Sequence, residues 1–303
     1  MWHSVMIWYR AIRPFSLSAA VVPVLVGSTL ATQDGVFGWW LFFLALLGSV
    51  LVQCGTNLTD EYADHHPGKG AEHKVQAPYK VIAQGLLTPA AVRRGAMTCF
   101  GLAGLIGVYL VSRTSWPLAL VCLASVGVAY GYSAGPLPLG HIGLGEPLVF
   151  VFMGPVIVLG SFYVQVQRLS WAVVWLSVPV GCLVTAILVA NNLRDAEEDR
   201  HSGKHTLVAL WGQRPVIWLF CLLVLVAFGT LPVLALSHVV PWVGLLPFVL
   251  VLPQSWRLIG LIWRGTERVV LHQALQGTAQ LHLRFGLLLT LAVSPALAWW
   301  RQA

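Results

Sequence analysis

The sequence predicts an all-α protein that spans a membrane many times, and three observations support this. Hydrophobic residues make up 57% of the 303 residues and charged residues only 10%, whereas about a quarter of a soluble domain is charged. Apolar runs long enough to cross a bilayer recur along the chain. These runs lack the apolar–polar alternation of a β-barrel, so helices must satisfy the backbone hydrogen bonds in lipid. We expect about nine transmembrane helices, over residues 14–32, 37–56, 90–112, 115–133, 145–166, 170–190, 215–236, 240–260 and 282–300.

The distribution of Lys and Arg predicts the orientation of these spans. With a cytoplasmic N-terminus, 15 of the 18 Lys and Arg residues fall in cytoplasmic segments, and only Arg113, Arg168 and Arg301 fall on the other side. This asymmetry follows the positive-inside rule. The net charge of +7 therefore indicates membrane topology, and we expect no nucleic-acid partner. We expect residues 1–303 to form one integral-membrane domain in a bacterial-type inner or plasma membrane.

Two acidic segments with the same spacing are the strongest functional signal in the chain. Residues 57–64 read Asn-Leu-Thr-Asp-Glu-Tyr-Ala-Asp, and residues 192–199 read Asn-Leu-Arg-Asp-Ala-Glu-Glu-Asp. They hold seven of the chain's 11 acidic residues. Each segment follows an apolar run and precedes a polar loop that contains Gly-Lys, which indicates two similar halves from an internal repeat. The predicted topology places both segments in the cytoplasm.

The spacing of these acids predicts a site for divalent metal ions. If each motif continues the helix before it, its two aspartates lie one turn apart on one helix face. Two such faces across a bundle would hold metal ions with a diphosphate between them, because Mg²⁺ prefers a few carboxylates together with phosphate oxygens and water. The predicted metal ligands are Asp60, Asp64, Asp195 and Asp199. Lys80, Arg194 and Lys204 are placed to contact the same phosphates or to pair with the acids.

The acids and the predicted phosphate site have other possible interpretations. A single motif of this kind would be better explained as solvated loop acids that pair with nearby Lys and Arg, but two matched motifs in an acid-poor chain favour a metal site. The sequence has no GxxxxGK[ST] motif, so nucleotide hydrolysis is unsupported.

A bound diphosphate would give these metal ions a chemical purpose. An allylic diphosphate leaves readily once metal ions and cations stabilise the departing charge. The carbocation that remains needs a dry cavity, where the π faces of tyrosines can stabilise it. Tyr62, Tyr79, Tyr130 and Tyr132 lie near the predicted cytoplasmic mouth, although a tyrosine of the interfacial belt is an equal alternative for each. Glu146 opens a span and is expected either to face the cavity or to cap a helix N-terminus.

Several polar segments lie on the same predicted side. The long loop 65–88 has the length of a functional lid, and residues 261–281 are polar enough to form an interfacial helix.

The motifs resemble those of a known family over nearly the full length of the chain. Residues 191–207 read Asn-Asn-Leu-Arg-Asp-Ala-Glu-Glu-Asp-Arg-His-Ser-Gly-Lys-His-Thr-Leu, and Tyr132 and Gly143 open Tyr-Ser-Ala-Gly-Pro-Leu-Pro-Leu and Gly-Leu-Gly-Glu-Pro. With the first acidic motif, these segments resemble the UbiA superfamily of intramembrane aromatic prenyltransferases. Within it, the likeness is strongest to the members that prenylate 1,4-dihydroxy-2-naphthoate.

This resemblance implies a nine-helix bundle of the UbiA type and a set of site residues. The four aspartates would hold Mg²⁺ with Asn57 and Asn192 assisting, and Lys80 would contact the diphosphate. Arg194, Lys204, Tyr132 and Glu146 would complete the substrate-binding set. The family often has Arg in place of Lys80. The members that prenylate 1,4-dihydroxy-2-naphthoate usually have Gly-x-Asp soon after the first motif, where this chain has Gly-Lys-Gly at 68–70.

The expected function is transfer of a polyprenyl group from polyprenyl diphosphate to an aromatic acid in the bilayer. With 1,4-dihydroxy-2-naphthoate as acceptor, the product is a demethylmenaquinone, with loss of diphosphate and the ring carboxyl group. The altered loop keeps other acceptors open, namely a dihydroxynaphthoate isomer, 4-hydroxybenzoate or homogentisate. A secondary transporter with internal repeats and a binding protein that has lost catalysis are the remaining alternatives.

Overall fold

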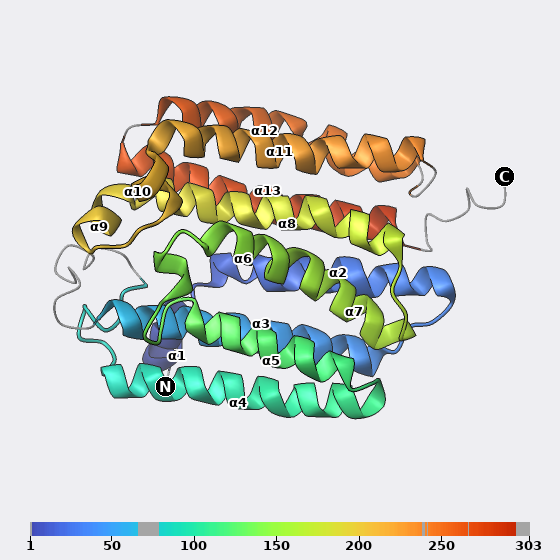
Figure 1. Cartoon of the computed structure of the whole chain (residues 1–303), viewed down its shortest axis with the longest axis horizontal. Helices are drawn as coiled ribbons and strands as arrows, with labels where there is room; N and C mark the ends of the chain where they lie inside the picture. The colour runs from blue at the N-terminus through green and yellow to red at the C-terminus, as the bar shows by residue number, and fades with distance from the viewer. Residues whose placement is uncertain (1, 66–78, 238–239, 241, 266, 295–303) are drawn as a thin grey trace.

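The chain folds into a bundle of long helices that lie side by side (Figure 1). The computed structural model describes residues 2–65, 79–237, 240, 242–265 and 267–294, and it contains no strand in these residues. The elements in chain order are α1 (Trp2–Ala11), η1 (Pro14–Ser16), α2 (Ser18–Ala31), η2 (Thr32–Asp34), α3 (Trp39–Asp64), α4 (Pro89–Arg113), α5 (Pro117–Gly131), η4 (Leu139–His141), α6 (Gly145–Val151), η5 (Phe152–Val156), α7 (Ile157–Val166), α8 (Trp171–Arg194), α9 (Ala196–His201), α10 (Leu207–Trp211), α11 (Gln213–Leu236), η6 (Trp242–Leu245), α12 (Leu246–Arg264) and α13 (Arg268–Ala292).

The predicted all-α membrane fold is confirmed. Within the described residues, seven helical segments are long and apolar enough to cross a membrane. They are Pro14–Asp34, Trp39–Asp64, Pro89–Arg113, Gly145–Val166, Trp171–Arg194, Gln213–Leu236 and Trp242–Arg264. The expected count of nine is not confirmed, because α5 has only 15 residues and α13 carries His272, His282 and Arg284 along its length.

The C-terminal part of the chain differs from the sequence expectation. An interfacial helix over 261–281 followed by a span over 282–300 was expected, but α12 continues to Arg264 and α13 runs unbroken from Arg268 to Ala292. The buried residues Leu271, Ala274 and Leu275 have the spacing of an amphipathic helix, and in α13 this face packs against α8 and α12. A helix between apolar neighbours therefore carries the same pattern as a helix on a membrane surface.

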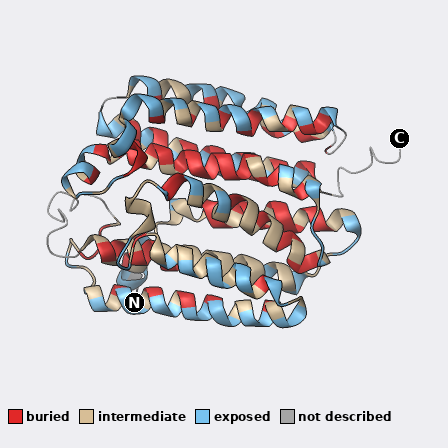
Figure 2. Cartoon of the chain, viewed as in Figure 1, coloured by how far each residue is buried: buried red, intermediate tan, exposed pale blue. Residues whose placement is uncertain are grey.

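The core of the bundle is centred on α8, which is largely buried, and on the buried face of α13 (Figure 2). Residues Val180–Ala190 of α8 are almost continuously buried, because α11, α13, α2 and α6 cover this helix on several sides. The helices approach closely where small residues meet. Gly154 in the π-helical turn η5 lies so near α8 that a Cβ atom there would be 2.5 Å from the Gly181 Cα.

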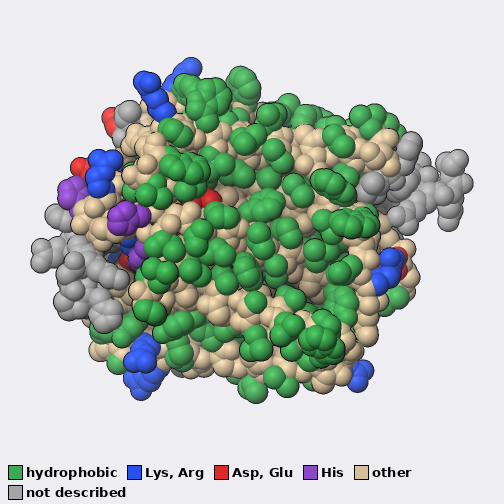
Figure 3. All heavy atoms as spheres, in the orientation of Figure 1, with side chains coloured by type: hydrophobic (Ala, Val, Ile, Leu, Met, Phe, Trp, Pro, Cys, Tyr) green, Lys and Arg blue, Asp and Glu red, His purple; other side chains and the backbone are tan. Residues whose placement is uncertain are grey.

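The outer surface of the bundle is apolar over most of its length. Figure 3 shows hydrophobic side chains across the middle of the molecule, with most charged side chains towards its ends. Leu105, Val108 and Leu123 are each 70% exposed, and Trp171 is 80% exposed. Such a surface is stable against lipid rather than water, so the protein is an integral membrane protein.

The contact between Gly154 and Gly181 yields a stability prediction. Gly154→Ala should destabilise the protein by about 1–3 kcal/mol, because the new methyl group meets backbone that cannot move aside. Gly229→Ala is the matched control, since nothing lies within 4 Å of its Cβ position. Thermal unfolding in detergent should show a lower midpoint for Gly154→Ala only. Equal midpoints would contradict the close packing of η5 on α8.

Candidate active site

The two acidic motifs lie at one end of the bundle, which we call the motif end. The first motif continues α3 to its last residue, Asp64, so Asp60 and Asp64 share one helix face as predicted. The second motif does not continue its helix unbroken: α8 ends at Arg194, and Asp195 (φ −96°, ψ 7°) separates it from α9. The Asp199 N–H still donates to the Asp195 carbonyl at 2.8 Å, so the one-turn spacing of the two aspartates is kept.

Both motifs line one cavity of about 420 Å³. Most of the predicted site residues line it, namely Asn57, Asp60, Asp64, Lys80, Tyr132, Asn192, Arg194, Asp195, Asp199 and Lys204. Glu146 is not among the lining residues. It is 4% exposed and accepts a hydrogen bond from Asn192 Nδ2 at 3.0 Å, so it supports a lining residue from behind. Away from the motif end the cavity walls are apolar, with Ile106, Leu110 and Leu118 among them.

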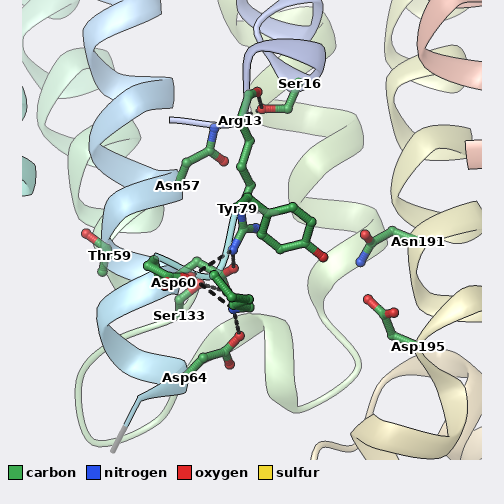
Figure 4. Close-up of polar contacts among 12 residues, drawn as sticks. Arg13, Ser16, Asn57, Thr59, Asp60, Asp64, Tyr79, Ser133, Asn191 and Asp195 are labelled. Carbon is green, nitrogen blue, oxygen red and sulfur yellow. Dashed lines mark hydrogen bonds and ion pairs between the residues drawn. The ribbon is translucent and has the colours of Figure 1, made fainter. Parts of the chain in front are cut away.

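The carboxylates of the first motif are each held by cations. Asp64 Oδ2 lies 2.6 Å from Lys80 Nζ, and its Oδ1 lies 3.0 Å from Lys204 Nζ. Asp60 Oδ2 lies 2.7 Å from Arg13 Nη2, while Ser133 Oγ donates to Asp60 Oδ1 at 3.1 Å. Figure 4 shows Asp60 and Asp64 on α3, with Arg13 and Tyr79 above them and Asp195 across the gap.

Lys204 joins the two halves of the chain. It follows the second motif, yet it pairs with Asp64 of the first motif and lies 4.0 Å from Asp199 Oδ1. Burial opposes its positive charge, but Asp64, Asp60 and Asp199 outweigh this effect and hold the pKa of the Lys204 ammonium above its ordinary value. The pKa of Lys80 is likewise raised, because Asp64 and its neighbours overcome the effect of burial. Both lysines are therefore positively charged at neutral pH.

The second motif carries its own cations. The Arg194 guanidinium forms two bonds with the Asp195 carboxylate, from Nε to Oδ1 at 2.8 Å and from Nη2 to Oδ2 at 2.5 Å. Arg194 Nη2 also donates to Asn191 Oδ1 at 2.8 Å. Arg268, at the start of α13, lies 3.7 Å from Asp195 Oδ1 and pairs with Glu198. Arg268 was not predicted as a site residue, because it lies far from both motifs in sequence.

Arg13 is a second residue that the site analysis of the sequence missed. It adopts a left-handed conformation (φ 53°, ψ 71°) just before Pro14, which is unusual for a residue other than glycine. Its guanidinium carbon lies 4.5 Å from the centre of the Tyr79 ring. The turn therefore brings a cation from the start of the chain to Asp60. Its place on the predicted side of the motifs was the only signal in the sequence.

Glu61 is the third residue missed, although it lies inside the first motif. Its side chain is 1% exposed. Its Oε1 accepts the Ile82 N–H at 3.0 Å, and its Oε2 lies 3.3 Å from Lys80 Nζ. Glu61 thus fastens the segment after the long loop to α3 and places Lys80 beside Asp64. Residues 66–78 of that loop, with the altered Gly-Lys-Gly sequence, lie outside the described part of the chain.

The predicted asparagines and tyrosines have distinct surroundings. Asn57 Nδ2 donates to the Ile12 carbonyl at 2.7 Å and to Ser16 Oγ at 2.8 Å, which ties α3 to the start of α2. Of the four tyrosines considered, Tyr79 and Tyr132 line the cavity. Tyr62 packs in an apolar cluster, and Tyr130 meets the Phe100 ring edge-on.

The donor set fits Mg²⁺ bound together with a substrate. The four aspartates offer hard oxygen ligands on two sides of one cavity. Among the described residues, no group of three or more His, Cys, Asp and Glu side chains converges on one point. A metal ion here would therefore complete its shell with water or phosphate oxygens, which is the coordination that Mg²⁺ favours.

Comparison with solved structures identifies the fold. The structure of a UbiA homolog from Archaeoglobus fulgidus bound to GPP and Mg²⁺ superposes with a TM-score of 0.67 over 93% of this chain and 99% of that one, at 12% identity. The bundle is therefore the fold of the membrane-embedded UbiA homologues.

Sequence comparison identifies the family. The UbiA prenyltransferase family pattern matches residues 20–276. The 1,4-dihydroxy-2-naphthoate octaprenyltransferase of Bacillus subtilis is 31% identical over 95% of this chain and 92% of its own length. The enzyme of the same name from Mycobacterium tuberculosis is 34% identical over 84% and 81%. This chain belongs to the UbiA prenyltransferase family, so the predicted enzyme class, a prenyltransferase, is confirmed.

The role of Glu61 can be tested by unfolding. Glu61→Ala should lower the free energy of unfolding by about 3–5 kcal/mol, because it leaves Lys80 with less compensation and the Ile82 N–H without its acceptor. The exposed Glu197, in α9, provides the control, and Glu197→Ala should change stability by less than about 0.5 kcal/mol. Thermal or denaturant unfolding in detergent measures both. A small effect of Glu61→Ala would show that Glu61 does not fasten the segment.

Proposed function

We propose that this enzyme transfers a polyprenyl group from polyprenyl diphosphate to 1,4-dihydroxy-2-naphthoate, with Mg²⁺ bound at Asp60, Asp64, Asp195 and Asp199. The observation that carries the proposal is a single cavity whose polar end holds both aspartate pairs and five Lys and Arg side chains and whose deeper walls are apolar. A polyprenyl diphosphate has the same division into an anionic head and an apolar chain.

The cations around the cavity suit the diphosphate head. Arg13, Lys80, Arg194 and Lys204 all line the polar end. Bound Mg²⁺ would neutralise the diphosphate oxygens and stabilise the charge that develops as the diphosphate departs. These cations lie in the same cavity as the aspartates, so they can turn from the carboxylates to the diphosphate oxygens when Mg²⁺ takes their place. The apolar walls at Ile106, Leu110 and Leu118 suit the first part of the prenyl chain and exclude water from a carbocation.

The proposed reaction forms a quinol without any further co-reactant. The C–O bond of the allylic diphosphate breaks, and both electrons leave with diphosphate. The electron-rich ring carbon that carries the carboxyl group forms the new C–C bond, and the carboxyl group then leaves as CO₂ and returns its electron pair to the ring. The product is a quinol, which becomes a demethylmenaquinone on later oxidation. The acceptor's own hydroxyl groups supply the electron density.

The choice of acceptor rests on the relatives. The Bacillus subtilis and Mycobacterium tuberculosis enzymes both carry 1,4-dihydroxy-2-naphthoate in their names. This favours that acceptor over 4-hydroxybenzoate and homogentisate.

The position of the acids disfavours a transporter. They lie at one end of the bundle, with Asp64 the last residue of α3, whereas the ion sites of transporters lie near the bilayer midplane. With the N-terminus and the motif end facing the cytoplasm, both substrates are met from inside the cell.

The function can be tested with membranes that contain the protein, a polyprenyl diphosphate and Mg²⁺. Offered 1,4-dihydroxy-2-naphthoate beside the other aromatic acids, the enzyme should prenylate the naphthoate and release diphosphate, and EDTA should abolish the product. Product from another acid would move the assignment to that acceptor. Cation-dependent uptake without release of diphosphate would support a transporter instead.

The metal site gives a sharper prediction. Asp64→Asn and Asp195→Asn should each lower kcat/KM by at least about 100-fold, because each removes a charged metal ligand. Asp34→Asn is a matched control: Asp34 lies in η2, away from the motifs, where it pairs with Arg168. The control should keep the parental rate. Equal rates in all three variants at saturating Mg²⁺ would refute the proposed metal site.

A further inference from the structure

Helix α3 carries a row of polar residues that extends from the metal motif into the membrane. Ser49, Gln53, Thr56 and Asn57 precede Asp60 at spacings of three or four residues, so they share its helix face. All four line the cavity. We call this row the polar ridge of α3. The opposite side of α3 carries exposed apolar residues such as Phe43 and Leu47, so the ridge faces inward.

Most of the ridge is satisfied by the protein itself. Ser49 Oγ donates to the Ala20 carbonyl at 3.2 Å, and Thr56 Oγ1 donates to the Val52 carbonyl at 2.8 Å. Asn57 is fixed by its bonds to the Ile12 carbonyl and Ser16, and Figure 4 shows its amide turned from α3 towards the Ser16 turn. These contacts hold the ridge in one conformation.

Gln53 is different. Its Nε2 donates to Asn57 Oδ1 at 3.3 Å, and within the described residues its carbonyl oxygen has no hydrogen-bond partner. Gln53 is half-buried and lines the cavity, so this oxygen can accept a hydrogen bond from a ligand bound there. Gln53 is seven residues from Asp60, which places it about 10 Å deeper along the helix.

The chemistry of Gln53 selects among the possible ligands. A prenyl chain has no group that can bond an amide, and the diphosphate is matched by the aspartates and cations at the motif end. An aromatic diol has hydroxyl groups that both donate and accept, on a flat apolar ring. The small residues Ala45 and Gly48 also line the cavity on α3, and the apolar Ile106 lines it as well, which suits the faces of such a ring.

The geometry points to Gln53 as a binding residue for a hydroxyl group of the aromatic acceptor, with the ring lying against the polar ridge. This assignment rests on the proposed function. The Gln53 amide oxygen accepts from a ring hydroxyl, and Asn57 holds the amide in place from the other side. The contact orients the ring so that its reacting carbon faces the prenyl diphosphate at the motif end.

Gln53→Leu tests the assignment by steady-state kinetics. The KM for 1,4-dihydroxy-2-naphthoate should rise about 10-fold, the typical effect of losing one hydrogen bond to a ligand, while the KM for the polyprenyl diphosphate stays within about two-fold. Gln213→Leu, at an exposed position at the start of α11, is the control and should match the parent. Gln53→Met, which keeps the length of the side chain, replaces Gln53→Leu if the leucine variant fails to fold.

Analogues of the acceptor identify the contact. 1-Hydroxy-2-naphthoate lacks the 4-hydroxyl group, and a 4-hydroxy-2-naphthoate lacks the 1-hydroxyl group. Used as competitive inhibitors, the analogue that lacks the bonded hydroxyl should bind parent and Gln53→Leu equally, whereas the other should bind the variant about 10-fold more weakly. Such a pattern is expected only from a direct contact.

The outcomes separate this inference from the proposed function. If the parent makes no product with any aromatic acid, both fail. If the parent prenylates the naphthoate and Gln53→Leu leaves the acceptor KM unchanged, the inference is overturned and the function stands. A rise in the KM for the diphosphate donor alone would also overturn it, because the ridge would then serve the donor.

Discussion

The site depends on two lysines, from opposite halves of the chain, that neutralise the negative charge of Asp64. Asp64 lies 2.6 Å from Lys80 and 3.0 Å from Lys204. The Asp64 side chain is only 12% exposed, so water does little to stabilise its charge, and the two lysines offset this loss. The same contacts hold the segment after the long loop against α3 and bring the second motif to the first. Two motifs far apart in sequence therefore share one cavity.

This arrangement also explains how the site can accept a highly charged substrate. Each aspartate that lines the cavity has an Arg or Lys nearby. When a diphosphate binds with its metal ion, the carboxylates can turn to the metal and the cations to the phosphate oxygens. Ion pairs are exchanged for other ion pairs, so the desolvation of these charges, which is the main cost of burying them, has largely been met during folding.

Much of the site could be predicted from spacing alone, because no Pro interrupts the apolar run before the first motif, and α3 continues through Gly48 and Gly55 to Asp64. The break at Asp195 has no Gly or Pro to mark it, and in the folded protein Asp195 pairs there with Arg194 and Arg268. Arg13 reaches Asp60 only through a left-handed turn, which local pattern does not indicate. The sequence gives no sign of the role of Glu61, because its partner Ile82 belongs to a separate segment. Long-range contacts of this kind produce no periodic pattern of residues from which they could be predicted.

The pairing of Lys204 with Asp64 has a consequence for the order of events during biosynthesis. The two residues are 140 positions apart, so at about 5–20 residues per second a ribosome makes Lys204 roughly 7 to 28 s after Asp64. Lys80 is only 16 positions from Asp64 and follows within about 1 to 3 s. During the interval the nascent first half enters the membrane with Lys80 as the early counter-ion of Asp64. When the second half of the chain emerges, Lys204 pairs with an Asp64 carboxylate that Lys80 already contacts.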